Sequence, residues 1–211
     1  MIDPSDFIIT RKRKKYKFAL FANSPLCFEG DAWVKRHVDV IELGAGTGHF
    51  SVELAAKYPN KVFVAVDVKA DRLQKGAAEA EILGLTNILF VRARADQLPE
   101  LFEPASLESI WLTFPDPFPK KRSAGRRMTH PNYLQRYKTL LKPSGSFYLK
   151  HDSRDFFLWS LEQFVDEKWH IDELSFDLHE SELSEDYKIK TAYEERWLGE
   201  GIPTNFVKAS L

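Results

Sequence analysis

Residues 38–48 read VDVIELGAGTG, and this stretch decides the fold that the sequence predicts. Its apolar first half predicts a buried strand, and its glycines predict a tight turn whose backbone can approach a ligand closely. The spacing G-x-G-x-G differs from the G-x-G-x-x-G of a dinucleotide-binding turn, because the third glycine comes one position early. With Glu42 just before the first glycine, the loop suits a ligand that has a positive end and no pyrophosphate.

Strands and helices alternate from this loop onward. Seven strands are predicted, at residues 38–43, 62–66, 87–91, 107–114, 146–150, about 169–176 and 205–209. Helices are predicted at 50–58, at 69–83, from a Thr129 cap to residue 141, and from a Ser153 cap onward. This alternation predicts an α/β fold, a mostly parallel sheet with helices on both faces. Ligands of such folds bind at the carboxyl ends of the strands, where five acids fall: Glu42, Asp67, Asp96, Asp116 and Asp152.

Charge is segregated along a chain whose formal net charge is only −1. Residues 11–17 carry six cations in seven positions, residues 120–127 carry five in eight, and residues 172–200 are acidic. Residues 1–30 show no clear period, so we expect a basic N-terminal arm there and a single domain at 31–211. Local charge steers a polyanion even where the total is neutral. The two basic runs therefore indicate either nucleic-acid contacts or plain solvated surface.

Composition disfavours several classes of protein. No apolar run is long enough to span a bilayer and no secretory leader opens the chain, so we expect no membrane partner. Cys27 is the only cysteine, which excludes an internal disulfide and suits the cytoplasm. The six histidines are scattered without ligand spacing, so we expect no metal site. A monomer and a homodimer both stay open.

A second informative stretch, FPDPFPKKR at residues 114–122, follows the predicted fourth strand. Asp116 stands between prolines in a rigid turn that suits a planar ring, although its role could be limited to forming that turn. Five cations follow and suit phosphates, which they would position without reading bases: Lys120, Lys121, Arg122, Arg126 and Arg127. Together these features indicate an enzyme that acts on nucleic acid.

The acids and glycines upstream of this turn describe a cofactor pocket. Asp67 ends the second strand, where a carboxylate can accept both hydroxyls of a ribose; the alternative is a helix N-cap. Asp96, after the third strand, could meet an adenine amino group or only form a turn. Together with Glu42, Gly44 and Gly46, these acids predict binding of S-adenosylmethionine.

Two long blocks and one short element follow the glycine loop: FPDPFPKKRSAGRRM at 114–128, DLHES at 177–181 and TAYEERWLGEGIP at 191–203. In these blocks the chain resembles the bacterial tRNA (guanine-N7-)-methyltransferases, and the resemblance runs from about Val38 to the C-terminus. It implies a Rossmann-like class I methyltransferase fold with a seven-stranded sheet. It also implies transfer of a methyl group from S-adenosylmethionine to N7 of a guanine in the variable loop of tRNA.

Matching positions carry roles over residue by residue. The resemblance makes Asp116 the active-site acid, and it implies four cofactor contacts: Glu42, Asp67, Asp96 and Asp116. It implies that the target nucleotide meets Lys120, Asp152 and the stretch with Thr191, Tyr193 and Glu194. Residues 122–127 would meet RNA. Tyr193 could equally be a core aromatic, and the DLHES block is expected to be structural rather than catalytic.

The chain departs from the family's pattern at five positions: Asp67 replaces Glu, Phe118 replaces Trp, Ser123 replaces His, Gly125 replaces Lys and His151 replaces Thr. Phe118 still offers an aromatic face for stacking. The changes at Ser123 and Gly125 put the detail of RNA contact in doubt more than the chemistry.

The chemistry of guanine N7 sets what such a site must do. N7 carries an exposed lone pair and no proton, so positioning and electrostatics matter more than a general base. The guanine ring gains the positive charge that the sulfonium loses, and a carboxylate on the guanine edge would stabilise it. We expect Asp116 to do this, with Asp152 or Glu194 as the second acceptor.

Other functions remain open. An amino-methyltransferase of adenine or cytosine would place [DN]-P-P-[FYW] after the fourth strand, which Asp116-Pro117-Phe118 matches only in part. A non-catalytic RNA-binding protein could keep this fold, and measurable S-adenosylmethionine binding would separate it from an enzyme. The glycine spacing disfavours a nicotinamide-dependent oxidoreductase, and the cationic block disfavours a small-molecule methyltransferase.

Overall fold

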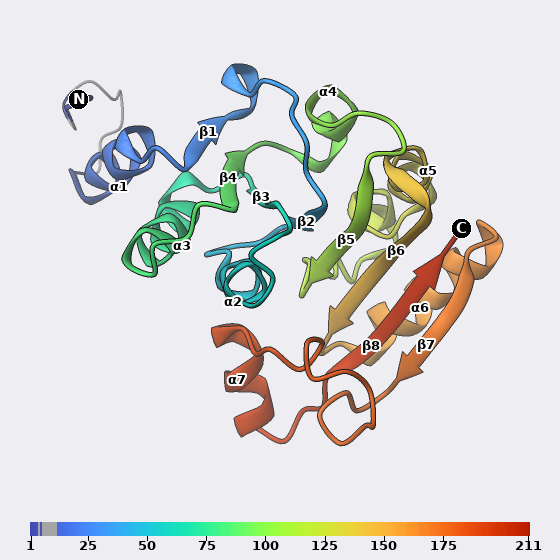
Figure 1. Ribbon diagram of the computed structural model, residues 1–211. Coiled ribbons are helices and arrows are strands. Elements are labelled where there is room, and N and C mark those ends of the chain that lie inside the picture. Colours follow the sequence, from blue (N-terminus) through green and yellow to red (C-terminus); the bar gives the residue numbers. More distant parts are fainter. Residues whose placement is uncertain (4, 6–11) are drawn as a thin grey trace. The chain divides into compact units, whose positions relative to one another are not determined.

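The computed structural model describes residues 1–3, 5 and 12–211, which form two compact units, Met1–Leu101 and Phe102–Leu211 (Figure 1). Each unit has four strands among its described residues. Within the described part of the chain, no helix has the length and apolar character that a bilayer crossing requires. Arg11 of the predicted basic run lies outside the described residues. The division into an arm at 1–30 and a domain at 31–211 stays a prediction.

Parallel strands form the sheet of the N-terminal unit, in the order β1-β4-β3-β2. Their bounds are β1 (Cys27–Glu29), β2 (Val40–Leu43), β3 (Phe63–Asp67) and β4 (Ile88–Arg92). Every residue of β2 and β3 is buried, as the continuous apolar runs of the sequence predict for strands covered on both faces. Leu43 pairs with Val66 and Asp67 with Arg92, so the strands end at one common edge.

Two helices connect these strands, α2 (His49–Lys57) and α3 (Ala70–Ile82), close to the predicted bounds. The face of α3 that the sequence predicts to be internal is fully buried at Leu73, Ala77 and Ala80. After β4 come a short 3-10 helix, η3 (Ala95–Gln97), and α4 (Leu98–Leu101). The small residues on α3 allow the helix to lie close to the sheet and the glycine loop.

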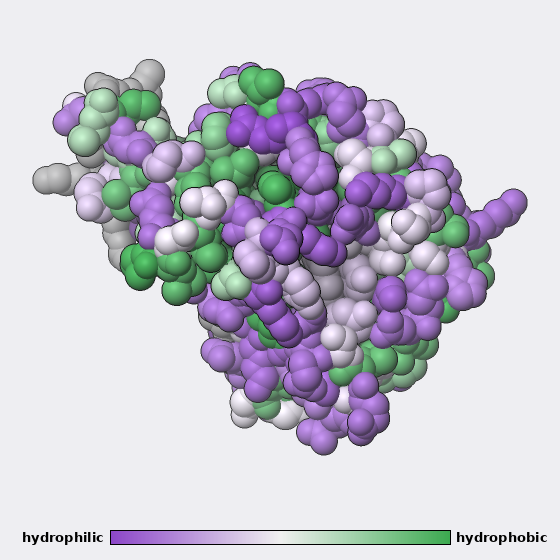
Figure 2. All heavy atoms as spheres, viewed as in Figure 1, coloured by the Kyte–Doolittle hydropathy of each residue, from purple (hydrophilic) through white to green (hydrophobic). Residues whose placement is uncertain are grey.

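The first part of the chain forms regular elements that its weak periodicity does not reveal. Helix α1 (Lys12–Asn23) packs against α3, and β1 adds an eighth strand to the seven predicted. Arg92 joins these parts, because its Nη1 donates to Glu29 Oε1 at 3.1 Å and its guanidinium lies 5.1 Å from the Phe18 ring centroid. Hydrophobic side chains also gather on the surface over α1 and α3 (Figure 2), where Leu20 and Ile82 are exposed.

The C-terminal unit has a mixed sheet in the order β5-β6-β8-β7. Strand β5 (Leu107–Thr113) runs parallel to β6 (Leu141–His151), and β8 (Asn205–Ser210) lies antiparallel between β6 and β7 (His170–Ser175). Aromatic side chains fill the core beside β6: the Phe147 ring lies 5.2 Å from the Tyr137 ring and 5.5 Å from the Phe164 ring, between centroids.

Three helices belong to this unit, α5 (Pro131–Leu140), α6 (Arg154–Asp166) and α7 (Ala192–Gly199). Ser153 caps α6 as predicted, accepting from Phe156 N at 3.4 Å. The predicted Thr129 cap of α5 is wrong. His130 caps this helix, and its Nδ1 accepts from Asn132 N at 3.3 Å. Thr129 is buried one position earlier and hydrogen-bonds Ser160 Oγ at 2.8 Å, because packing against α6 competes for its hydroxyl.

Candidate active site

The glycine loop joins β2 to α2 in the N-terminal unit. Gly44, Gly46 and Gly48 have φ values of 66°, 60° and 73°, a backbone conformation that other residues rarely adopt. Asp67 holds this loop in place, because its Oδ2 accepts from Gly46 N at 2.8 Å. Asp67 is therefore not the N-cap of α3: Lys69 occupies that position, and its backbone N donates to Asp67 Oδ1 at 2.8 Å.

The two acids beside the loop are both buried, Glu42 at 1% exposed and Asp67 at 9%. Glu42 Oε2 accepts from Ser51 Oγ at 2.6 Å, which fixes its carboxylate against α2. The two Asp67 oxygens accept one backbone N–H each, whereas an ionised carboxylate has about four acceptor positions. Asp67 thus keeps the capacity for two further donors, which is the number that a ribose diol offers.

Gly76 contacts the glycine loop closely, which the sequence did not predict. It lies on α3 where the helix crosses the glycine loop, and a Cβ there would come within 2.0 Å of Thr47 O and 2.7 Å of the Phe90 ring. Glycine inside a helix costs about 1 kcal/mol relative to alanine, so its presence on the buried face is itself a signal of close packing. Only the absence of a side chain lets α3 support the loop at this distance.

A cavity of about 420 Å³ opens beyond the carboxyl ends of β3 and β4. Val68, Arg94 and Gln97 are among its lining residues, and Asp96 is not. The Asp96 carboxylate instead accepts from the Arg94 guanidinium at 2.9 and 2.7 Å. The structure therefore brings the turn that holds Asp96 to the cavity, while the carboxylate forms an ion pair within that turn. Its contact with adenine stays a prediction.

In the C-terminal unit, the backbone around Asp116 is strained on both sides. Phe114 and Phe118 have φ values of +50° and +41°, and conformations of this kind cost on the order of 1–3 kcal/mol each, so the surroundings must impose them. Phe114 N donates to Lys150 O at 2.9 Å, and His151 Nε2 hydrogen-bonds Pro115 O at 2.9 Å. These bonds fix the turn to the end of β6 and leave Asp116 exposed at its tip.

Arg127 also holds this turn. Its Nε donates to Pro117 O at 3.0 Å and its Nη2 to Phe118 O at 3.2 Å, while the guanidinium lies 4.3 Å from the Trp159 ring centroid. The Arg126 guanidinium also packs on this turn, 4.3 Å from the Phe118 ring centroid. Of the five cations predicted to meet RNA, Arg127 is the one that hydrogen-bonds backbone carbonyls of the turn among the described contacts. The other four are exposed, three of them on the 3-10 helix η4 (Lys121–Arg126): Lys120, Lys121, Arg122 and Arg126.

Asp152 presents a carboxylate oxygen that receives no hydrogen bond. Burial lowers the pKa of the neighbouring His151 imidazole and keeps it neutral. Its Nδ1 accepts from Ser153 N at 2.8 Å, so the ring proton is on Nε2 and is donated to Pro115 O. Asp152 Oδ1 lies 3.3 Å from His151 Nδ1, but this nitrogen carries no proton and so donates no hydrogen bond to the oxygen. No donor among the described residues reaches this buried oxygen, and such a group calls for a ligand or an explanation.

Tyr193 adds an aromatic surface near the two acids. Its ring lies 5.4 Å from the Phe114 ring and 5.7 Å from the Trp197 ring, between centroids, and the side chain is 48% exposed. Burial raises the pKa of the Tyr193 hydroxyl, and the negative charges of Asp152 and Asp116 raise it further. Tyr193 is therefore a half-exposed surface aromatic and not a core residue.

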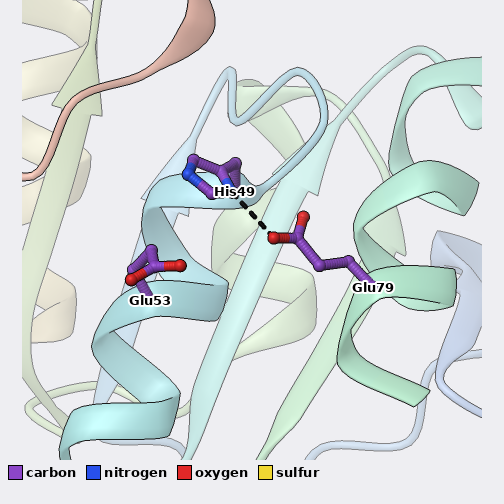
Figure 3. A group of neighbouring side chains, drawn as sticks. All are labelled: His49, Glu53 and Glu79. Atoms are coloured by element: carbon purple, nitrogen blue, oxygen red, sulfur yellow. Dashed lines mark hydrogen bonds and ion pairs between the residues drawn. The ribbon is translucent and has the colours of Figure 1, made fainter. Parts of the chain in front are cut away.

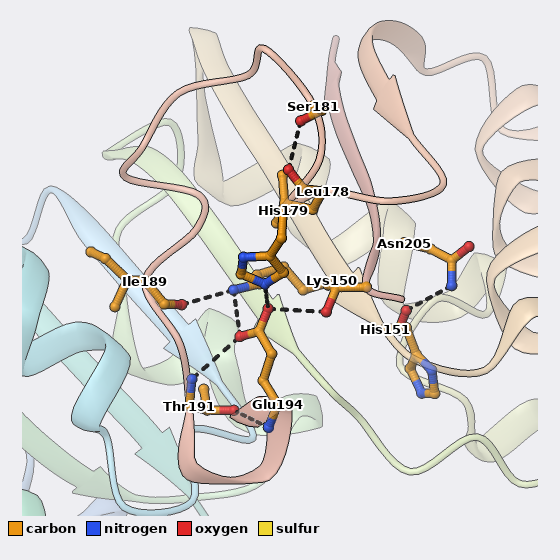
Figure 4. Close-up of polar contacts among 10 residues, drawn as sticks. Lys150, His151, Leu178, His179, Ser181, Ile189, Thr191, Glu194 and Asn205 are labelled. Carbon is orange, nitrogen blue, oxygen red and sulfur yellow. Dashed lines mark hydrogen bonds and ion pairs between the residues drawn. The ribbon is translucent and has the colours of Figure 1, made fainter. Parts of the chain in front are cut away.

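Thr191 and Glu194 open α7 with a reciprocal pair of hydrogen bonds. Thr191 Oγ1 accepts from Glu194 N at 3.1 Å, and Glu194 Oε2 accepts from Thr191 N at 3.3 Å, which is a capping box. Figure 4 shows that the Glu194 carboxylate points into the protein, where it is 0% exposed. The structure thus separates Glu194 from the exposed face that Tyr193 presents.

One group of described side chains could hold a cation, His49, Glu53 and Glu79, whose ligand atoms lie within 4.8 Å of one another (Figure 3). His49 Nδ1 is 2.9 Å from Glu79 Oε1, and this bond between α2 and α3 already accounts for their closeness. Glu53 is exposed and lies one helical turn after His49. The prediction of no metal site, made because the histidines lack ligand spacing, did not consider this pair. We assign no ion to this group.

Comparisons with known proteins agree on one family. A family model described as "Putative methyltransferase" matches residues 36–205. The chain is 34% identical over 198 residues to a tRNA (guanine-N(7)-)-methyltransferase of Brevibacillus brevis, covering 92% of each protein. It is 36% identical over 172 residues to one of Cytophaga hutchinsonii, covering 80% of this chain and 78% of that protein.

Solved structures bear on the fold. The 16S rRNA methyltransferase KamB has a TM-score of 0.62 to this chain at 18% identity, covering 83% of this chain and 88% of that one. At this identity the likeness concerns the fold alone, and it confirms the predicted α/β class.

Proposed function

Because this chain belongs to the family of tRNA (guanine-N7-)-methyltransferases, we propose that it transfers a methyl group from S-adenosylmethionine to N7 of a guanine in the variable loop of tRNA. The observation that carries the proposal beyond family membership is the buried Asp152 oxygen without a donor. Guanine offers N–H donors on its Watson–Crick edge, and a carboxylate can only accept. The acceptor that the described residues leave without a donor is thus of the type that guanine requires.

The residues of the N-terminal unit fit S-adenosylmethionine, which when bound would supply a methyl group on a positively charged sulfur. The positive φ values of Gly44 and Gly46 open the loop for close approach, and buried Glu42 offers negative charge to the cofactor's positive end. Asp67 keeps two acceptor positions for the ribose hydroxyls. We propose that the adenosine part occupies the cavity that Val68 and Gln97 line.

In the C-terminal unit, Asp152 and Asp116 would stabilise the positive charge that develops on the guanine ring. A preorganised carboxylate acts most strongly where water is excluded, so Asp152, whose side chain is 16% exposed and whose Oδ1 is buried, should contribute more than exposed Asp116. Phe114 and Tyr193 provide ring faces beside these acids, against which a planar base can pack. The half-exposed position of Tyr193 supports this use.

Asp116→Asn tests the role of the exposed acid. We expect kcat for tRNA methylation to fall about 30-fold, because the charge is lost but water already screens it. The melting temperature should stay within about 2 °C of wild type, since surface substitutions usually change stability by less than about 0.5 kcal/mol. Single-turnover methylation would measure the rate, and a rate near that of wild type would remove Asp116 from the proposal.

Phosphate binding is proposed for Lys120, Lys121 and Arg122. Each phosphate contact on a single strand contributes about −0.7 to the slope of log K against log salt, so replacing all three by alanine should flatten that slope by about 2. Arg127→Lys is the control. It keeps the charge and so the slope, but it removes the bonds to Pro117 and Phe118 and should lower stability. An unchanged slope in the triple variant would contradict phosphate binding here.

We also propose that the enzyme works in the cytoplasm, as its similarity to tRNA methyltransferases suggests. Burial raises the pKa of the Cys27 thiol to about 12, which keeps this single cysteine unreactive. The choice between a monomer and a homodimer stays a prediction.

A further inference from the structure

We propose that Glu194 is a positioning residue, which anchors the start of α7 through a buried network and so places Tyr193 beside Asp152 and Asp116. This network is called the Glu194 lock below, and its members are Lys150, His179, Thr191, Glu194 and Thr204. The inference rests on the proposed function and deepens it. It replaces the direct contact between Glu194 and the target nucleotide that the resemblance to the family implies.

The Glu194 carboxylate already has as many hydrogen bonds as it can accept. Oε1 accepts from His179 Nε2 at 2.8 Å and from Thr204 Oγ1 at 3.1 Å. Oε2 accepts from Lys150 Nζ at 2.7 Å and from Thr191 N at 3.3 Å. An ionised carboxylate has about four acceptor positions, so none remains for the N–H groups of a guanine. Glu194 is also fully buried, and a substrate could reach it only by breaking these bonds.

Lys150 makes the lock hard to open. Its side chain is 0% exposed, and Nζ also donates to Ile189 O at 2.8 Å, so the ammonium ends inside the protein with Glu194 as its charge partner. Removing one member of a buried ion pair leaves the other charge uncompensated. Burial by itself raises the pKa of Glu194, but the hydrogen bond from His179 and the charge of Lys150 outweigh this and lower it. Glu194 therefore stays ionised at neutral pH.

The lock joins segments that are far apart in the sequence (Figure 4). Lys150 lies near the end of β6, His179 lies in the DLHES block, Thr191 caps α7, and Thr204 directly precedes β8. His179 thus has a structural partner, as the sequence suggests for that block. A carboxylate that ties the α7 cap to three other segments fixes the direction in which α7 begins.

Two sets of contacts connect the lock to Phe114, at the start of the turn that carries Asp116. Tyr193 is the neighbour of Glu194 in the first turn of α7, and its ring packs against Phe114. Lys150 O accepts from Phe114 N at 2.9 Å, at the start of the turn that carries Asp116. Both sets of contacts end at the strained Phe114. Loosening Glu194 should therefore shift Tyr193 without removing any group that touches the substrate.

A double-mutant cycle between Glu194→Gln and Tyr193→Ala tests this. We expect Glu194→Gln to lower kcat for tRNA methylation about 30-fold and to leave the KM for S-adenosylmethionine unchanged. In the Tyr193→Ala background the same substitution should cost less than about 3-fold, because residues that act through one another are not additive. Glu195→Gln is the matched control, an identical change at the next, exposed position of α7, and it should have no effect. Losses that multiply in the double variant would overturn the proposal in favour of direct contact.

A spectroscopic readout keeps the test independent of activity. The protein is labelled with 3-fluorotyrosine. The 19F resonance that is present in the wild type and absent from the Tyr193→Phe variant belongs to residue 193. It should shift or broaden in Glu194→Gln and not in Glu195→Gln; an unmoved resonance would contradict the lock. If Glu194→Gln does not fold, His179→Asn removes one of the four bonds and should shift the same resonance. Absence of methylation by the wild type would refute the proposed function. The 19F measurement would still show whether Glu194 positions Tyr193.

Discussion

Asp152→Asn is expected to lower kcat/KM for tRNA methylation by about 10²- to 10³-fold and to leave the folded protein as stable as wild type or more stable. Loss of one preorganised electrostatic contact to a developing charge has an effect of about this size. The amide also presents an NH₂ donor toward the guanine donors. Stability should be retained or increase in the variant, because a buried carboxylate oxygen without a donor is unfavourable and the amide carries no charge.

The opposite signs make this prediction specific. Asp155→Asn is the matched control, an exposed acid in the first turn of α6, and it should leave activity unchanged and reduce stability slightly. Single-turnover kinetics and thermal unfolding measure the two quantities on the same preparations. A clear loss of stability in Asp152→Asn would show that its carboxylate is a structural partner, and a retained rate would show that it does not stabilise the reaction.

Gly76→Ala is expected to weaken S-adenosylmethionine binding by more than about 100-fold or to lower the free energy of unfolding by about 3 kcal/mol, at the upper end of overpacking effects. The added Cβ would lie 2.0 Å from Thr47 O, and a backbone carbonyl cannot rotate away as a side chain can. Either α3 or the glycine loop must therefore move. Calorimetric titration with the cofactor and denaturant unfolding would show which of the two yields.

Gly199→Ala is the control for that prediction. Gly199 ends α7, and nothing lies within 4 Å of the position of its Cβ. There alanine should stabilise the protein by up to about 1 kcal/mol through helix propensity. The same substitution would thus act with opposite signs on two helices, and equal effects would mean that the close approach at Gly76 has no consequence.

The fold was predictable where local pattern and burial agree. Strands such as β2 and β3 are buried on both faces, so their continuous apolar runs are enough to find them. The segment with α1 and β1 was not predictable, because its order depends on tertiary contacts with α3 and β4 that no local period encodes. The Thr129 cap failed for the same reason, since Ser160 competes for the hydroxyl from thirty-one positions away.

The sequence predicted which residues belong to the candidate site but not which contacts each of them makes. Motif order was enough to name Asp116, Asp152 and Tyr193, which do gather in one unit. It could not show that Glu194 is buried, because both of its strong partners, Lys150 and His179, are distant in the sequence. It could not show either that Arg127 bonds backbone carbonyls of the turn. An arginine that contacts phosphate and an arginine that holds a turn are the same residue type, so the sequence alone does not distinguish them.

The most direct test of the central claim is methyl transfer from labelled S-adenosylmethionine to a tRNA whose variable-loop guanine is intact or replaced by 7-deazaguanine, which has a carbon in place of N7. We expect label in the intact tRNA, with chemical cleavage for 7-methylguanine at that one nucleotide, and none in the 7-deazaguanine tRNA. Equal labelling of both would contradict reaction at N7 and favour an amino-methyltransferase. No label in either, despite cofactor binding, would contradict tRNA methylation itself.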